Sequence, residues 1–410
     1  MQAQRTADRA DYLRDICGKL WPHPATAELG PRRAAQAGDR SMIVLPGLRD
    51  PRLLVPAERR PAAAAVRRYG EPGSVRSAVV TRALAAALAS GLGPRLLRGR
   101  LTVRVPPGAQ TIESRLNQTL GRQVLVSVHL GAPRANRKPV LQLLTEAGET
   151  IGFAKVGINP LTAGLVGAEH AALQRLHATG LRHLHAPRVL GRDRWNDLEI
   201  LVLSPLPVWQ RRTPPQPRAL RRAMAEIAGV AGLKESPITG SEYWRRLTVR
   251  LDAALDGTEH AALGSALASL DNLAGAATLR FGSWHGDWTP WNMASTTEGL
   301  LVWDWERFCT PAPTGFDALH CWLQAEVVGN KAEPAEAART CVRRAPELLE
   351  PFGVTGREAR LTALLYLADL SVRYLTDRQE EAGAALGAPR RWLLPALKAG
   401  ISDLQAREDA

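Results

Sequence analysis

Residues 284–308, WHGDWTPWNMASTTEGLLVWDWERF, gather the residue types that phosphoryl chemistry requires. Phosphoryl transfer needs one carboxylate to orient the attacking hydroxyl, and separate oxygen ligands to hold magnesium against the phosphates. An Asp and an Asn at i and i+5 on a tight loop can face one space. Asp287 is therefore the candidate catalytic residue, and Asn292 is a candidate metal ligand together with Asp304.

The surrounding residues predict a loop that a short strand completes. Pro290 favours an irregular loop over a helix between Asp287 and Asn292. The apolar run 300–303 predicts a strand that would deliver Asp304 to the same place.

Upstream, the pattern over residues 123–203 is β-β-β-α-β-β. We expect strands at 123–130, 139–144, 150–156 and 198–203, a helix at 165–179 and a short extended piece at 188–189. Lys155, one of six lysines in the chain, lies near the end of a strand, and Glu169 lies inside the helix. Beyond the Pro-rich stretch 204–217, strands nearly vanish and helices are expected.

HGDxxxxN followed by a WDWE-type segment resembles the aminoglycoside phosphotransferase and choline kinase-like superfamily, which shares the protein-kinase fold. The resemblance implies a bilobal α+β chain with a small β-rich lobe and a larger helical lobe. It assigns Asp287 to catalysis and Asn292 and Asp304 to magnesium. His285 fits an architectural loop histidine and Asp317 a structural Asp, while Glu306 takes an acidic position without a defined role.

The same resemblance implies a site for ATP or GTP. Lys155 would neutralise phosphate oxygens and Glu169 would hold it in position by an ion pair. Backbone groups around Ser204 and Leu206 would meet the adenine edge. The loop 131–138 has one glycine and no GxGxxG, which disfavours a protein kinase; Arg134, Asn136, Arg137 and Lys138 are its candidates for covering phosphates.

The resemblance begins near residue 111, which predicts three parts. Residues 1–110 form an extra α/β segment of unassigned role, 111–203 the nucleotide-binding lobe, and 204–410 the helical lobe that carries catalysis and acceptor binding. In the first part we expect helices at 8–20, 62–69 and 74–90, and strands at 41–45, 52–55 and 101–105.

Composition narrows the function classes. The chain has 410 residues and a net charge of +13, but residues 1–100 alone carry 18 basic and 8 acidic residues. Few aromatic residues accompany that excess, which disfavours nucleic-acid binding. No apolar run is long enough for a membrane span and the first 20 residues are charged throughout, so we expect a cytoplasmic protein. The four cysteines show no metal-ligand or disulfide spacing.

These observations predict an ATP- and magnesium-dependent phosphotransferase acting on a hydroxyl of a small molecule, such as a sugar, an amino alcohol or an antibiotic. Phosphorylation of Ser or Thr in a peptide, and a catalytically silent kinase-like binding module, are the alternatives. Trp288 and Trp291 are candidates for lining the acceptor pocket. For a cationic acceptor, the acidic candidates are Glu326, Glu333, Glu336, Asp369 and Asp377.

Overall fold

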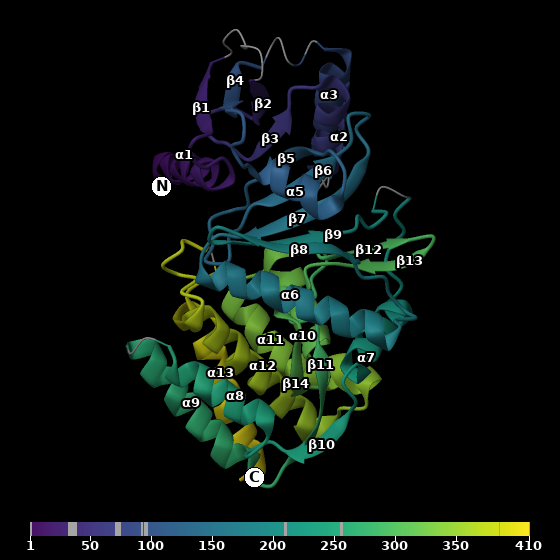
Figure 1. Ribbon diagram of the computed structural model, residues 1–410. Coiled ribbons are helices and arrows are strands. Elements are labelled where there is room, and N and C mark those ends of the chain that lie inside the picture. Colours follow the sequence, from purple (N-terminus) through teal and green to yellow (C-terminus); the bar gives the residue numbers. More distant parts are fainter. Residues whose placement is uncertain are drawn as a thin grey trace. The chain divides into compact units, whose positions relative to one another are not determined.

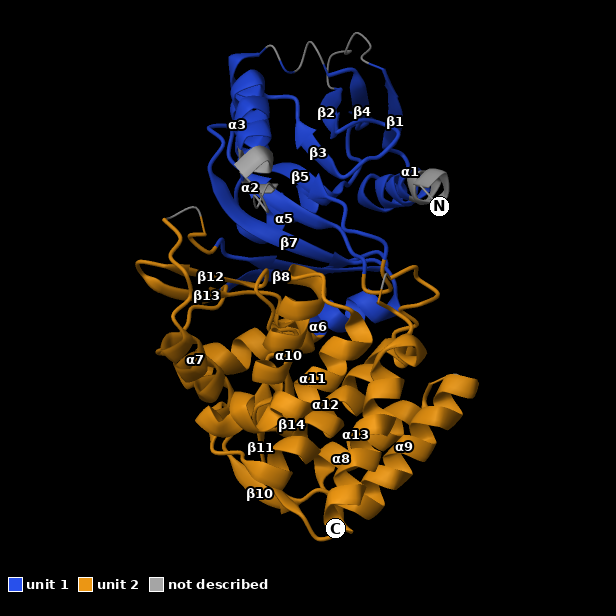
Figure 2. Cartoon of the chain, turned by 180° about the vertical axis from the view of Figure 1, so that it is seen from behind, with its two compact units in different colours: residues 1–133, 137–167, 188–205 blue, residues 134–136, 168–187, 206–410 orange. Residues whose placement is uncertain are grey.

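The computed structural model describes residues 2–31, 39–69, 75–91, 93, 97–208, 211–254, 257–384 and 386–409. The chain divides into two compact units, coloured separately in Figure 2. The first unit comprises residues 1–133, 137–167 and 188–205. The second comprises residues 134–136, 168–187 and 206–410.

The first unit is built on a sheet that has nine strands among the described residues, in the order β1-β4-β2-β3-β5-β6-β7-β9-β8. Every adjacent pair is antiparallel. The strands are β1 (Thr26–Pro31), β2 (Arg40–Leu45), β3 (Leu53–Pro56), β4 (Gly99–Arg104), β5 (Leu125–His129), β6 (Val140–Leu144), β7 (Thr150–Gly157), β8 (Val189–Trp195) and β9 (Leu198–Leu203).

Alternating side chains of these strands bury both faces of the sheet. On β2, Met42 and Val44 join the core that contains residues of α1 and α5, whereas Ile43 and Leu45 join the core formed with α2 and α3. Figure 1 shows α2 and α3 side by side next to the sheet. The helices are α1 (Gln2–Leu20), α2 (Arg59–Tyr69), α3 (Val75–Ser90) and α5 (Ile112–Leu120).

A buried polar contact fixes the end of α1 against α5. The indole nitrogen of Trp21 donates to both carboxylate oxygens of Glu113, at 3.1 and 2.9 Å. Thr111 and Ser114 cap the start of α5 reciprocally. Pairing of β3 with β5 joins the strands before residue 110 to the strand that carries Lys155, so one sheet spans both segments.

The second unit is largely helical and carries short strands. A sheet of three strands has the order β10-β11-β14, and β12 pairs with β13. Helix α6 (Pro160–Thr179) begins in the first unit and ends in the second. The other elements are α7 (Pro217–Gly229), β10 (Lys234–Pro237), α8 (Glu242–Asp252), α9 (Thr258–Ala274), β11 (Thr278–Trp284), β12 (Met293–Thr296), β13 (Gly299–Val302), β14 (Cys309–Pro313), α10 (Phe316–Gln324), α11 (Pro334–Leu349), α12 (Gly356–Thr376) and α13 (Leu393–Glu408).

Aromatic side chains join β11 to the helices in the core of this unit. Phe316 of α10 lies edge-on to Trp284, Tyr243 and Tyr366, with ring centroids 5.1, 5.8 and 5.7 Å apart. Helix α12 lies at the centre, because all residues from Leu361 to Arg373 are buried. The end of β11, where the HGD sequence follows, is therefore held by the most buried part of the unit.

The expected α+β class is confirmed, with a β-rich part followed by a largely helical part. Differences from the sequence prediction lie in the strands. Strand β1 lies outside the predicted strands, and β8 is seven residues rather than two. Strands β10, β11, β12 and β14 lie where strands were expected nearly to vanish. β10 is mostly exposed, and its residues show no apolar alternation that could reveal it. None of the helices in the described ranges is long and apolar enough to cross a bilayer.

Candidate active site

The predicted catalytic residues lie on two adjacent connections of the second unit. His285, Gly286 and Asp287 follow β11 directly, Asn292 precedes β12, and Asp304 follows β13 after one residue. Because β12 and β13 pair from Met293 to Val302, their open ends meet, and the Trp303 amide donates to the Asn292 carbonyl at 3.0 Å. The hairpin therefore brings both predicted metal ligands to the end that faces the HGD loop.

Both carboxylate oxygens of Asp287 have a hydrogen-bond partner. The side-chain amide of Asn292 donates to Oδ2 and to the backbone oxygen of Asp287, each at 2.9 Å. His320, from α10, lies with its Nε2 3.1 Å from Oδ1. Asn292 uses its nitrogen for Asp287, so its Oδ1 is the atom suited to a cation. The Asp287 side chain keeps 36% of its surface exposed.

The carboxylate form of Asp287 is favoured. Burial alone would raise the pKa of this carboxyl, but the hydrogen bond from His320 brings it below its ordinary value. Burial lowers the pKa of His320 itself, although the bond to Asp287 opposes the change. Asp287 is thus an ionised hydrogen-bond acceptor of low basicity at neutral pH.

Asp317 holds the backbone of the HGD loop. It lies near the start of α10, and its oxygens accept the amides of His285 at 2.8 Å and Gly286 at 3.3 Å. Burial raises the pKa of this carboxyl to about 7, although the two backbone bonds oppose the change. Gly286 has φ +83°, and a Cβ there would lie 2.1 Å from the carbonyl oxygen of Arg307. The chain at this turn therefore requires glycine.

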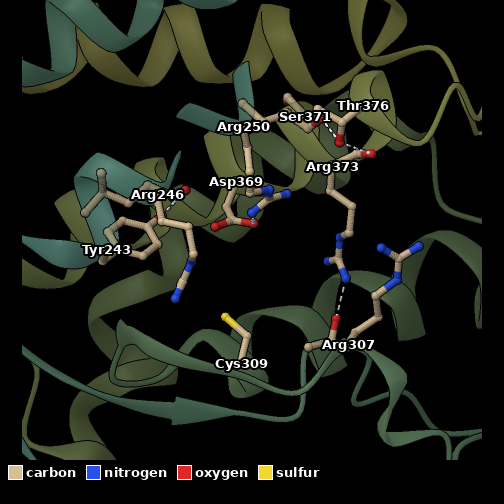
Figure 3. A network of polar contacts seen from close by, with 12 residues as sticks. Tyr243, Arg246, Arg250, Arg307, Cys309, Asp369, Ser371, Arg373 and Thr376 are labelled. Atoms are coloured by element: carbon tan, nitrogen blue, oxygen red, sulfur yellow. Dashed lines mark hydrogen bonds and ion pairs between the residues drawn. The ribbon is translucent and has the colours of Figure 1, made fainter. Parts of the chain in front are cut away.

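Arg373 holds the same turn from the other side. Figure 3 shows the Arg373 side chain extending from α12. Its Nη1 donates to the Gly286 carbonyl at 2.6 Å. The residue is 8% exposed, and its guanidinium lies 5.4 Å from the Trp284 ring. Its charge lowers the pKa of Asp287. The buried Arg373 guanidinium thus binds the backbone of the HGD loop and favours the ionised form of Asp287.

His285 is an architectural residue of the loop, in agreement with its expected role. Its Nδ1 accepts the Asp287 amide at 3.1 Å, so Nε2 carries the proton and donates to the Trp303 carbonyl at 3.1 Å. Burial lowers the pKa of this imidazole to about 4. The ring is fully buried and lies 4.4 Å from the Trp305 ring. His285 therefore ties the HGD loop to the segment that carries Asp304.

Carboxylates converge around Asp304. Glu169, Asp304 and Glu306 each place an oxygen within 4.8 Å of the others. Glu169 is fully buried, and its Oε1 accepts the Trp305 amide at 3.2 Å. Asp304 has φ +71°, a left-handed conformation that costs about 1–2 kcal/mol for a residue with a Cβ. Oxygen donors gathered in this way are the ligand type that magnesium prefers.

The predicted nucleotide residues belong to both units. Lys155 lies on β7 of the first unit and Glu169 on the part of α6 that belongs to the second, and their ion pair stays a prediction. Ser204 follows β9; its amide donates to the Arg188 carbonyl and its Oγ accepts the Arg188 amide, at 2.8 and 2.9 Å. Leu206 is buried, and its carbonyl accepts the Val208 amide.

The loop 131–138 is held at several points. Asn136 donates to Glu306 at 3.2 Å. Arg137 is 8% exposed and stacks 3.5 Å above the Tyr12 ring, and Lys138 is 7% exposed. Both side chains are thus mostly buried.

The acidic acceptor candidates and Trp288 are already engaged by the chain, whereas Trp291 is exposed. Trp288 is fully buried and donates to the Met293 sulfur, whereas Trp291 is 38% exposed. The acidic side chains contact the chain itself: Asp369 pairs with Arg250, Asp377 with Arg307, Glu336 with Arg339 and Arg343, Glu333 caps α11, and Glu326 accepts from Asn330. Figure 3 shows Asp369 facing Arg250.

Sequence reasoning missed His320 and Arg373. Each lies on a helix, 33 and 87 residues along the chain from the residue that it contacts. The available signal was weak: an ionisable residue at an otherwise apolar helix position, as in FDALHCWL and ADLSVRYL. Such a residue needs a buried partner, but the partner cannot be named without the fold.

The sequence of the chain matches a known protein family. The sequence profile of the Phosphotransferase enzyme family matches residues 155–388, more than half of the chain. The protein therefore belongs to this phosphotransferase family, and the resemblance inferred from the HGD and WDWE segments is confirmed. The family is matched from Lys155 onward, so residues 1–154 lie outside the profile. No curated protein matches the chain in sequence.

Several solved structures are similar. The choline kinase LicA from Streptococcus pneumoniae is 15% identical, with a TM-score of 0.46 over 72% of this chain and 98% of that one. The aminoglycoside phosphotransferase APH(4)-Ia, solved as a thermostable mutant with ADP and hygromycin B, is 14% identical, with a TM-score of 0.43 and coverage of 72% and 98%. A choline/ethanolamine kinase family protein from Mesorhizobium loti is 14% identical, with a TM-score of 0.38 and coverage of 68% and 92%.

Replacing Gly286 by alanine should damage the turn beyond the strain of its φ angle. Gly240, with φ +80° and no atom within 4 Å of an added Cβ, is the matched control. We expect Gly240→Ala to cost about 1–2 kcal/mol from left-handed strain. Gly286→Ala should cost a further ~1–3 kcal/mol, because the loop must move away from Arg307. Urea unfolding of both variants measures the difference; equal losses would contradict the close approach.

Asp317 should make stability fall as the pH rises. Its folded pKa of about 7 lies above the unfolded value, so its contribution is complete below about pH 4 and is lost as the pH rises through 7. The loss is on the order of 4 kcal/mol. Asp317→Asn lacks this titration, so its unfolding free energy relative to wild type should rise between pH 4.5 and 7.5. Parallel pH profiles for wild type and variant, with exposed Asp403→Asn as control, would refute the assignment.

Proposed function

We propose that the protein transfers the γ-phosphoryl group of ATP, or of GTP, to a hydroxyl of a small molecule, with magnesium required. The observation that carries this proposal is the Asp287 carboxylate, which is partly exposed and held on both oxygens at the end of the HGD loop. A carboxylate in that state can accept a hydrogen bond from an alcohol. The hydrogen bond orients the alcohol oxygen toward the phosphorus atom that it attacks.

The donor set fits magnesium. The amide N–H groups of Asn292 donate to Asp287, which leaves the neutral Oδ1 of Asn292 for a cation. Asp304 supplies a carboxylate oxygen from the neighbouring segment. Glu169 and Glu306 add negative charge close to Asp304. When bound, magnesium would neutralise charge on the phosphate oxygens. In the proposed site Asn292 and Asp304 hold it, whereas Asp287 is reserved for the acceptor.

For the nucleotide, the proposal keeps the residues that the sequence resemblance implies. We assign the phosphates to Lys155, positioned by Glu169, and the adenine edge to backbone groups around Ser204 and Leu206. Ser204 uses its amide for Arg188, so its carbonyl is the group suited to a purine amino group. Residues 111–203 would thus bind nucleotide, and residues 204–410 would carry catalysis and the acceptor.

Transfer would be direct, without a phosphorylated enzyme. The low basicity of Asp287 suits orientation of the hydroxyl more than early removal of its proton. Catalysis then rests on positioning and on charge stabilisation, as expected for a loose phosphoryl-transfer transition state. The acceptor would be a small alcohol. Of the acidic residues considered for a cationic acceptor, each is engaged by the chain itself, so they lend no support to a polycation.

Replacing Asp287 by asparagine should separate binding from transfer. We expect Asp287→Asn to retain the stabilisation by ATP and magnesium, and to lose phosphoryl transfer by several orders of magnitude, because an amide accepts the hydroxyl proton poorly. Thermal shift with ATP, magnesium or both measures binding. ADP formation against a panel of sugars, amino alcohols, antibiotics and Ser/Thr peptides measures transfer. Exposed Asp403→Asn is the matched control and should behave as wild type.

The panel also distinguishes the competing functions. Transfer only to peptide hydroxyls would replace the small-molecule acceptor by a peptide. A thermal shift that requires both ATP and magnesium, without ADP formation on any hydroxyl or on water, would indicate a silent binding module. Undiminished transfer by Asp287→Asn would refute the proposed role of Asp287.

A further inference from the structure

His320 and Tyr366 form a buried polar pair behind Asp287. His320 lies on α10 and is 2% exposed; Tyr366 lies on α12 and is fully buried. The Tyr366 oxygen lies 2.9 Å from Nδ1 of His320, and Nε2 of His320 lies 3.1 Å from Oδ1 of Asp287. Both imidazole nitrogens are therefore engaged, one by a phenol and one by the catalytic carboxylate.

The chemistry of the partners fixes which nitrogen carries the proton. An ionised carboxylate offers only acceptor oxygens, so Nε2 must carry a hydrogen to face Asp287 at 3.1 Å. Nδ1 of a neutral imidazole is then a lone pair, and the Tyr366 hydroxyl donates to it. The opposite tautomer would place a lone pair against the carboxylate. The chain of donors thus runs from Tyr366 through His320 to Asp287.

This chain completes the support of the carboxylate. Asn292 donates to Oδ2 and His320 to Oδ1, from a loop and from a helix respectively. Two donors from different directions fix the carboxylate plane as well as its position. A single donor would leave the side chain free to rotate about its last torsion angle, which is broad in aspartate.

The packing around His320 supports a positioning role. Its ring lies edge-on to Trp284 and to Tyr366, with centroids 6.4 and 5.9 Å away. Phe316, one turn earlier on α10, packs on the same two aromatic side chains. The imidazole is thus held in one orientation by the core, and its hydrogen bonds are not replaced by solvent.

We propose that His320, its tautomer set by the Asp287 carboxylate and supported by the hydroxyl of Tyr366, is a positioning residue that fixes the Asp287 carboxylate in the orientation that receives the acceptor hydroxyl. This inference rests on the proposed phosphotransferase function. In this role His320 neither touches the acceptor nor exchanges a proton with it. Its contribution is geometric, and misplacement of a reacting group by about 1 Å can cost about 100-fold in rate.

Variants that keep or remove the N–H group test the proposal. Gln places an amide nitrogen where His carries Nε2, so His320→Gln retains the donor, whereas His320→Leu removes it. We expect His320→Leu to lower kcat about 100-fold with the KM for ATP within about threefold. His320→Gln should stay within about tenfold of wild type, and Tyr366→Phe should fall between the two. Tyr243→Phe removes another buried hydroxyl, which donates to the Leu365 carbonyl, and should keep wild-type kcat.

ADP formation from ATP and magnesium is the readout, with the acceptor found in the hydroxyl panel or with water. Wild-type kcat in His320→Leu would overturn the proposal. So would equal losses in His320→Gln and His320→Leu, provided that both keep the thermal shift with ATP and magnesium, because the effect would then come from packing rather than the hydrogen bond.

Nitrogen-15 NMR of the histidine imidazoles separates this inference from the proposed function. In wild type, the signal that His320→Gln removes should belong to a neutral ring protonated on Nε2. Tyr366→Phe should shift the Nδ1 signal of that ring, because it removes the donor to Nδ1, and should leave the proton on Nε2. Protonation on Nδ1 would overturn the inference, whatever the activity. An inactive wild type that shows the Nε2–H tautomer would overturn the phosphotransferase proposal and leave the donor chain established.

Discussion

The carboxylate of Asp317 is the constraint on which the site depends. It accepts the amides of His285 and Gly286, and so fixes the turn immediately before Asp287. Its burial is costly, since its pKa is raised to about 7. The loop can therefore be held in this way only because α10 presents Asp317 from inside a close-packed aromatic core.

The rest of the site extends this one attachment. Gly286 permits the left-handed turn, Arg373 binds the carbonyl on its far side, and His285 reaches across to Trp303. The β12–β13 hairpin then returns Asp304 to the neighbourhood of the loop. Stability and function are thus coupled, because the hydrogen bonds that satisfy buried backbone groups also position the carboxylates.

The sequence predicts which residues gather near the HGD loop better than it predicts which residues support them. Asp287, Asn292 and Asp304 lie within 18 positions, and their spacing reflects the hairpin that joins them. His320, Tyr366 and Arg373 come from helices whose facing sides are set by tertiary packing. Period-2 and period-3.6 patterns predict helices and strands, but they do not specify which buried polar groups will meet. Short polar strands such as β10 escape detection for the same reason.

The most direct test of the account is the position of the metal in a crystal structure of the full chain with ADP and Mn²⁺. Anomalous scattering from manganese should give a peak bonded to Asn292 Oδ1 and to Asp304, at about the 2.1 Å typical of magnesium–oxygen bonds. The Asp287 carboxylate should remain bonded to Asn292 and His320, without a metal contact. A peak ligated by Asp287, or nucleotide bound with no metal at Asp304, would contradict the assignment of the site.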